Sequence, residues 1–229
     1  MIGIIGNFIP FLLISWSEQY IQSNTAGLLL SVGPIFTLIL SHFLTKDDKF
    51  TLLKLISILI GLVGTLFIIG FNTILNLTSG ESINLIPKIS IILAAFGYVI
   101  SSIIAYNIKN VDTISLTTFV TLSAAIISIP FMIYAEMNYS SNVNYNSIIA
   151  IVYLGLFPTA IAFQLRFHII SKAGPIFLSY VAYLIPVFAI IWGYIFLKEK
   201  INLEIMFGVA LILFGVFISQ KKSSKIINE

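Results

Sequence analysis

Two stretches of the chain follow one pattern, and this repeat decides how the rest is interpreted. Residues 48–64 read DKFTLLKLISILIGLVG, and residues 199–215 read EKINLEIMFGVALILFG. In both, sixteen positions separate the first acidic residue from the last glycine of an apolar segment. Working outward, residues 7–70 and 157–219 share the same order of apolar segments and polar links, with an internal proline at Pro34 and Pro186. Membrane proteins built from two such copies are typically transporters or channels with a central site.

Composition indicates an integral membrane protein. Of 229 residues, 59% are hydrophobic and 9% are charged, against about 25% charged in an average soluble domain. This polar fraction is too small to cover the surface of a water-soluble protein. We therefore expect the chain to lie in a lipid bilayer. The net charge of +3 is small and the lysines are dispersed, which gives no indication of a nucleic-acid partner. The chain has no cysteine, which excludes disulfides and Cys-ligated metals, and no motif calls for a cofactor.

Eight apolar segments are near the length of about 20 residues that a membrane-spanning helix needs. They predict an all-α membrane protein, because a membrane barrel would need short alternating segments. A polar loop after residue 71 divides the chain into an N-terminal copy of three helices, residues 1–71, and a C-terminal copy of five, residues 87–220, followed by a tail at 221–229. The predicted segments are residues 2–21, 24–45, 50–71, 87–108, 113–135, 147–171, 175–197 and 201–219.

The positive residues predict the orientation, because cytoplasmic loops carry the excess of Lys and Arg. With the C-terminal tail inside, nine positive residues fall on the cytoplasmic side, and Lys88, Lys198 and Lys200 fall outside. Both termini are therefore expected in the cytoplasm. The first copy then enters the membrane from inside and the second from outside, so the repeat is inverted. Inverted repeats are the architecture from which alternating access arises.

The order and spacing of motifs carry a resemblance to a known family. Pro186 is followed by Leu197-Lys198-Glu199 and then by Gly208 and Gly215. This order resembles the EamA-type domain of the drug/metabolite transporter superfamily, and residues 91–98, IILAAFGY, are similar to the opening helix of that domain's second copy. The family usually has glycine where this chain has Lys198, a departure confined to the loop. The resemblance implies a secondary transporter in the bacterial inner membrane that exports a small organic metabolite or drug-like solute.

The resemblance also implies a difference in length. Family members typically have ten helices as two copies of five, and this chain resembles them from the third helix onward. Met1 leads directly into the apolar run Ile2-Gly3-Ile4-Ile5, with no positive residue and no signal-peptide region before it. We therefore expect a truncated or mis-started gene, with a genuine eight-helix variant as the alternative. Whether the protein forms a homodimer is left open.

Polar residues in the first helix form a candidate substrate path, because polar groups within membrane spans are costly and usually functional. Two interpretations of Glu18 are open: an interfacial carboxylate near the outer end, or a cation or proton site on the path. Trp16 is expected in the aromatic belt, with stacking on a substrate as the lesser alternative. The residues spaced by three or four, and so placed on one face, are Asn7, Phe11, Ser15, Glu18 and Gln22.

The sixth helix offers a similar stripe, from which Gln164 is taken as a candidate path residue. Arg166 points elsewhere, and we expect it to snorkel to the cytoplasmic surface. His42 and His168 lack acidic or Cys partners at metal-ligand spacing, so no metal site is expected. The members of the stripe are Tyr153, Phe157, Gln164, His168 and Ser171.

Pro34 and Pro186 are candidate hinges, because proline inside a helix removes a backbone hydrogen bond and kinks it. Kinks that only improve packing are the alternative. The paired glycines, Gly61 with Gly64 and Gly208 with Gly215, are expected to let helices approach closely. Side chains near the prolines or on the fourth helix are further candidates for the central cavity: Ser31, Tyr98, Ser101, Tyr180 and Tyr183.

Three functional classes are consistent with these features. A secondary transporter working by alternating access is the leading hypothesis. An integral membrane enzyme would need clustered acidic or His residues, and the one close acidic pair, Asp47 and Asp48, is interpreted as a solvated turn among lysines, so no catalytic residue is assigned. A non-transporting fragment, or a membrane subunit that needs a partner, is the third class. Besides the bilayer, a small-molecule substrate is the expected partner.

Overall fold

The structure, a computed structural model, describes residues 1–70, 85–138, 144–198 and 202–220. In these ranges the regular elements are helices, five of them long and apolar enough to cross a membrane, with shorter apolar helices beside them. The prediction of an all-α membrane protein is confirmed. The predicted tail at 221–229 and most of the polar loop after residue 71 lie outside the described residues.

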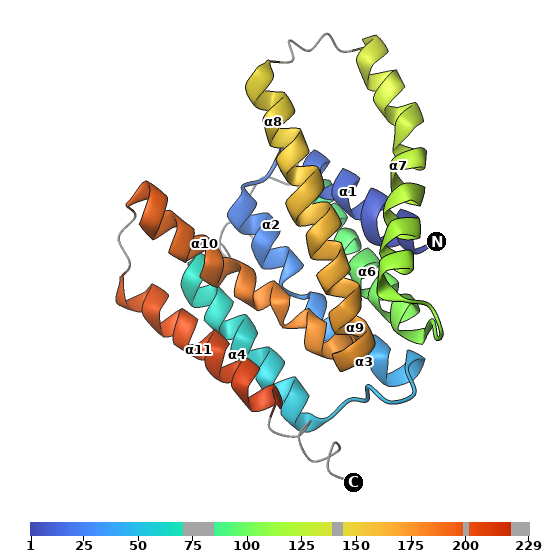
Figure 1. Cartoon of the computed structure of the whole chain (residues 1–229). Coiled ribbons are helices and arrows are strands. Elements are labelled where there is room, and N and C mark those ends of the chain that lie inside the picture. The colour runs from blue at the N-terminus through green and yellow to red at the C-terminus, as the bar shows by residue number, and fades with distance from the viewer. Residues whose placement is uncertain (71–84, 139–143, 199–201, 221–229) are drawn as a thin grey trace.

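The helices follow the eight predicted segments (Figure 1). The first segment forms a π-helix, η1 (Ile4–Phe8), and α1 (Ile9–Ser17); the second forms α2 (Ser23–Leu30) and α3 (Gly33–Leu44). Then come α4 (Leu52–Ile69), α6 (Leu85–Asn107) and α7 (Thr113–Asn138). The sixth segment forms α8 (Tyr145–Leu154), a second π-helix, η3 (Gly155–Ile161), and the first part of α9 (Ala162–Ser179), which breaks at Gly174. The seventh forms the end of α9 and α10 (Val181–Leu197), and the last forms α11 (Leu203–Gln220).

Side chains at the helix starts explain several of these bounds. Thr51 accepts the backbone N–H of Lys54 at 3.2 Å, and Asn144 accepts that of Ser147 at 2.8 Å, so each satisfies a donor that the first helical turn leaves free. Asp112 does the same for Ser115 at 2.9 Å ahead of α7. The hydrogen bonds from Ser115 lower the pKa of the Asp112 carboxyl.

The two segments that carry the matched prolines, residues 24–45 and 175–197, are both interrupted. Between α2 and α3 the N–H of Val32 bonds to the carbonyl of Leu29, and between α9 and α10 the N–H of Tyr180 bonds to that of Phe177. These i to i−3 bonds are of the 3₁₀ type, which in mid-helix often marks a hinge. Pro34 therefore lies at the start of α3, not inside one kinked helix as expected, whereas Pro186 does lie inside α10.

Glycines bring α4 and α11 into backbone contact. A Cβ built on Gly64 would stand 2.7 Å from the carbonyl oxygen of Gly208, and a Cβ on Gly208 would stand 2.7 Å from that of Gly64. No side chain fits at such distances. The two helices run antiparallel side by side (Figure 1), and the prediction that these glycines allow close helix packing is confirmed.

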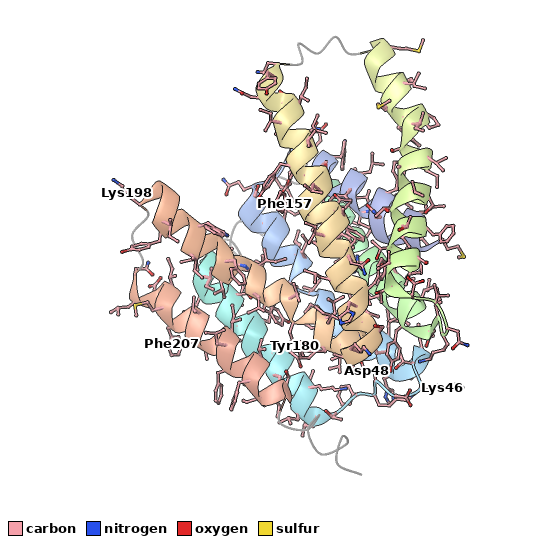
Figure 2. The ribbon with its side chains drawn as sticks, viewed as in Figure 1. Lys46, Asp48, Phe157, Tyr180, Lys198 and Phe207 are labelled. Carbon is pink, nitrogen blue, oxygen red and sulfur yellow. The ribbon has the colours of Figure 1, made fainter. Side chains whose placement is uncertain are left out.

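Elsewhere in the bundle, α6 packs against η1, α1, α2, α3 and α9. One core cluster joins α3, α4, the end of α9, α10 and α11, and a second joins the N-terminus to α6, α7 and the first part of α9. The polar ends of the bundle lie apart: Lys46 and Asp48 are at one end and Lys198 at the other (Figure 2). The members of the first cluster include Leu38, Ile58, Ile176, Tyr183 and Ile212, and those of the second include Ile2, Ala105, Val120, Phe163, Phe167 and Ile170.

Candidate functional site: a polar groove beside a buried arginine

A groove of about 410 Å³ lies between η1, α1, α7 and the second π-helix, η3. Its volume is within the range of about 300–1,000 Å³ that small-molecule sites occupy. Its walls mix apolar side chains with hydroxyl and amide groups, which suits an organic molecule that has a polar end. The lining residues are Asn7, Phe8, Phe11, Leu12, Ser15, Thr121, Ala124, Ala125, Ser128 and Thr159.

The groove contains two of the candidates expected from the first helix, Asn7 and Ser15. The polar wall contributed by α7 was not predicted. Thr117, Thr121 and Ser128 recur at intervals of four and seven, so their spacing along one helical face was a usable signal. The α7 hydroxyls bond to their own helix, as Thr121 does to the carbonyl of Thr117 at 2.9 Å, which lets them lie in an apolar bundle.

Arg166 points into the bundle from α9, opposite its expected direction. Its Nη2 donates to the carbonyl of Tyr98 at 3.0 Å and to the hydroxyls of Ser101 and Ser102 at 2.9 Å each. Its Nη1 donates to the carbonyl of Gly6 at 3.5 Å. The snorkelling prediction is wrong because α6 and η1 offer this set of acceptors inside the protein.

The sequence contained a signal that the Arg166 side chain points into the bundle. Arg166 shares the i, i+3 and i+4 face of α9 with Phe163, Phe167 and Ile170, all buried. The predicted stripe ran from Tyr153 to Ser171 and so crossed η3. A π-helix has more residues per turn than an α-helix, so the residues after η3 do not lie on the face that a regular α-helix would give them, and His168 is exposed. Arg166 therefore no longer counts among the positive residues predicted on the cytoplasmic side. The remaining positive residues are all lysines, with eight predicted on the cytoplasmic side and three outside.

Aromatic rings surround the Arg166 guanidinium and link it to the groove. The rings of Tyr98 and Phe163 each have their centroids 5.3 Å from its central carbon, and that of Phe167 is at 5.9 Å. Phe163 in turn stacks on the groove residue Phe11, with 6.4 Å between ring centroids. The candidates Tyr98 and Ser101 therefore belong to the arginine's surroundings.

Other candidates lie apart from the groove. Tyr180 and Tyr183 are in the core cluster (Figure 2 labels Tyr180), where the ring of Tyr183 fills the space that a Cβ on Gly61 would need. Ser31 is buried at the α2–α3 interruption and donates to the carbonyl of Leu28 at 2.6 Å. Gln164 donates to the Thr113 hydroxyl at 3.1 Å. The candidates do not form one continuous site.

Glu18 and Trp16 lie at the end of α1. The helix ends at Ser17, and Glu18 is exposed immediately after it, outside the set of groove residues. The indole of Trp16 is exposed and contacts the ring of Tyr20, with 5.1 Å between centroids. This placement favours the interfacial interpretation for both residues.

The charged turn before α4 differs from expectation. Asp48 is buried, with its Oδ1 at 2.7 Å from the Lys54 ammonium, whereas Asp47 is exposed. Interpreting both aspartates as solvated was wrong for Asp48, because this carboxylate also binds the chain near Gly174. No group of three or more His, Cys, Asp or Glu suited to a metal occurs within the described ranges.

Comparison with known proteins agrees with this architecture. A family model described as the EamA-like transporter family matches residues 1–70 and 85–220. The chain belongs to the EamA-like transporter family. This EamA-like chain is 24% identical to the "Uncharacterized transporter YoaV" of Bacillus subtilis over 90% of its own length and 70% of that protein's. It is 27% identical to an "Uncharacterized transporter" of Archaeoglobus fulgidus over 96% of its length and 76% of the other's.

The fold has a solved counterpart. A crystal structure superimposes with a TM-score of 0.80, covering 96% of this chain and 76% of the other, at 18% identity. At this identity the match shows the fold alone. Together with the family match and the apolar helices, it identifies an integral membrane protein of a transporter family.

Proposed function

We propose that this EamA-like chain exports a small organic solute by alternating access, with the groove as part of the path. The observation that carries the proposal is a contact that occurs twice. The sequence repeat pairs Gly64 with Gly215 and Ser57 with Gly208, each 151 positions apart. A Cβ on Gly64 would meet the Gly208 carbonyl at 2.7 Å, and a Cβ on Gly215 would meet the Ser57 carbonyl at 2.8 Å. When each residue is replaced by its counterpart in the other copy, the contact of Gly64 with Gly208 becomes the contact of Gly215 with Ser57.

A two-fold axis that relates two elements produces reciprocal contacts of this kind. Because α4 and α11 are antiparallel, the axis lies across them, which supports an inverted repeat. Two inverted halves can exchange conformations and so open a shared path first to one face and then to the other. The interruptions before Pro34 and around Tyr180 supply bending points in equivalent helices, so Pro34 and Pro186 remain our hinge candidates.

We also propose that both termini are cytoplasmic, in a bacterial inner membrane. The eight-to-three division of lysines supports this orientation. The end of the bundle with Lys46 is then inside, and the end with Lys198 is outside (Figure 2).

Cysteine accessibility tests alternating access directly, because the chain contains no cysteine. Ser128→Cys places a thiol in the groove wall on α7. We expect a membrane-impermeant maleimide to label it in right-side-out and in inside-out vesicles. Phe119→Cys is the matched control, since Phe119 is on the same helix with 73% of its surface exposed and lines no part of the groove, so it should face lipid and resist labelling.

Transport itself is measured on the purified chain in liposomes. A mixture of small metabolites is supplied outside, and mass spectrometry identifies those that accumulate relative to empty liposomes. Accumulation of no solute, together with labelling of Ser128→Cys from one face only, would contradict the proposal and favour a fragment or a subunit that needs a partner.

A further inference from the structure

We infer that Arg166 binds the negative end of the transported molecule, so that the substrate is an organic acid carrying one carboxylate. This inference rests on the proposed transport function and specifies its substrate class. It begins from the sequence: Arg166 is the single arginine among 229 residues and lies well inside the apolar helix α9.

The charge of Arg166 has no carboxylate partner within the described parts of the chain. The ion pair found there joins Lys54 to Asp48. The guanidinium is held instead by neutral groups, namely the carbonyls of Gly6 and Tyr98 and the hydroxyls on α6. A charge inside a membrane protein is costly unless it is paired, so the site retains a positive charge that an anion would neutralise.

The guanidinium also retains hydrogen-bonding capacity. It has five N–H donors, but among the described residues its bonds come from Nη2 and from one 3.5 Å contact of Nη1. Two parallel N–H groups fit the two oxygens of a carboxylate. The Ser101 and Ser102 hydroxyls, which also donate to the carbonyl of Tyr98, hold the fork in place.

The groove offers a route to this charge. Gly6, whose carbonyl accepts from Arg166, directly precedes Asn7 in the groove wall, and Asn7 is 6% exposed. No hydrogen bond from the Asn7 amide to another described residue is found, so the amide is available to a polar ligand. Phe163 stacks on Phe11 between the guanidinium and the groove, which gives an apolar or aromatic body a surface to contact.

Charge balance selects a monocarboxylate over a phosphate ester. One guanidinium neutralises one negative charge. A phosphomonoester carries about −1.5 to −2 at pH 7, so its complex would keep a net negative charge in the bilayer. A neutral amide of the same shape leaves the arginine unpaired.

Arginine-selective modification by phenylglyoxal tests the inference without a transport assay, because the chain has a single arginine, whose modified peptide is told apart from that of the N-terminal amine. The purified chain is treated with phenylglyoxal, and the modified peptide is quantified by mass spectrometry. We expect modification of Arg166 that phenylacetate and other monocarboxylates slow by about tenfold at saturation, whereas phenylacetamide and phenyl phosphate slow it much less. A guanidinium that does not react in the folded protein, or one that no monocarboxylate protects, would overturn the inference and leave Arg166 as a structural clamp.

Variants separate charge from folding. Arg166→Gln should fold, and its thermal midpoint in detergent without ligand serves as its own reference; phenylacetate should not raise that midpoint as it does in the unaltered chain. Arg166→Lys keeps the charge without the fork and should recover part of that rise. An unchanged phenylacetate effect in Arg166→Gln would refute the assignment.

The outcomes for the two proposals are distinct. Protection of Arg166 by monocarboxylates in a chain that transports none of them would retain the anion site and reject transport. Accumulation of neutral solutes that Arg166→Gln leaves intact would retain transport and reject the anion site.

Discussion

Asp48 accepts the backbone N–H of Ile176 at 2.9 Å, and so joins the turn before α4 to the break within α9 at Gly174. Gly174 makes this contact possible. It has a positive φ of 87°, and a Cβ there would stand 2.7 Å from Asp48 Oδ2. The carboxylate thus acts as a helix N-cap supplied from 128 residues away in sequence.

Asp48→Ala should therefore destabilise the fold. It leaves the N–H of Ile176 without its acceptor and removes the partner of Lys54, and an unsatisfied buried donor costs about 1–3 kcal/mol. Asp48→Asn keeps an acceptor oxygen and should lose less. The thermal midpoint in detergent measures both, and Asp47→Ala is the matched control, because Asp47 is the exposed neighbour. Equal losses at both positions would contradict the assigned contact.

Gly208→Val should destabilise the α4–α11 interface. Its side chain would meet the backbone of Gly64, which has no flexible atoms to move aside, and overpacking of this kind costs about 1–3 kcal/mol. Gly27→Ala is the control, since nothing lies within 4 Å of a Cβ there. Because alanine is preferred over glycine within a helix by about 0.5–1 kcal/mol, Gly27→Ala should be neutral or slightly stabilising. Two variants with the same thermal midpoint would show that the close approach is absent.

Asn7→Leu should reduce transport, because Asn7 supplies a buried amide to the groove wall. Loss of one hydrogen-bonding group corresponds to about a tenfold drop in uptake by reconstituted liposomes. Glu18→Gln provides the contrast: Glu18 is exposed beyond the end of α1, and we expect its uptake to stay within about twofold of the unaltered chain. A large loss in Glu18→Gln with normal uptake in Asn7→Leu would return Glu18 to the substrate path.

Asp47→Cys and Tyr145→Cys should lie on opposite faces of the membrane. Both side chains are exposed, and neither substitution changes the count of lysines. An impermeant maleimide added to intact cells should label Tyr145→Cys alone, and permeabilised cells should show labelling of both. Labelling of Asp47→Cys in intact cells would reverse the proposed orientation.

The groove could be predicted only in part. Asn7 and Ser15 were found because, with Phe11 between them, they recur every four residues along an apolar segment and so mark one face of a helix. Tyr180 and Tyr183 were expected near a cavity because they lie close to Pro186, but they pack in the core among α3, α4, α10 and α11. Nearness to a proline in sequence does not specify which neighbouring helix a side chain meets.

A membrane protein of apolar helices in two repeated copies could be predicted from the residues alone, because helix length and hydrophobicity are local properties and the repeat is visible as spacing. Gly64 and Gly208 were identified as packing residues from the pattern alone, since small residues have that role in most membrane helices. Tertiary structure decided the rest. Arg166 turns inward because Tyr98, Ser101, Ser102 and Gly6 supply acceptors from elements 64 to 160 residues away. The energy of a buried charge depends on groups that only folding brings together, and spacing along one helix does not record them.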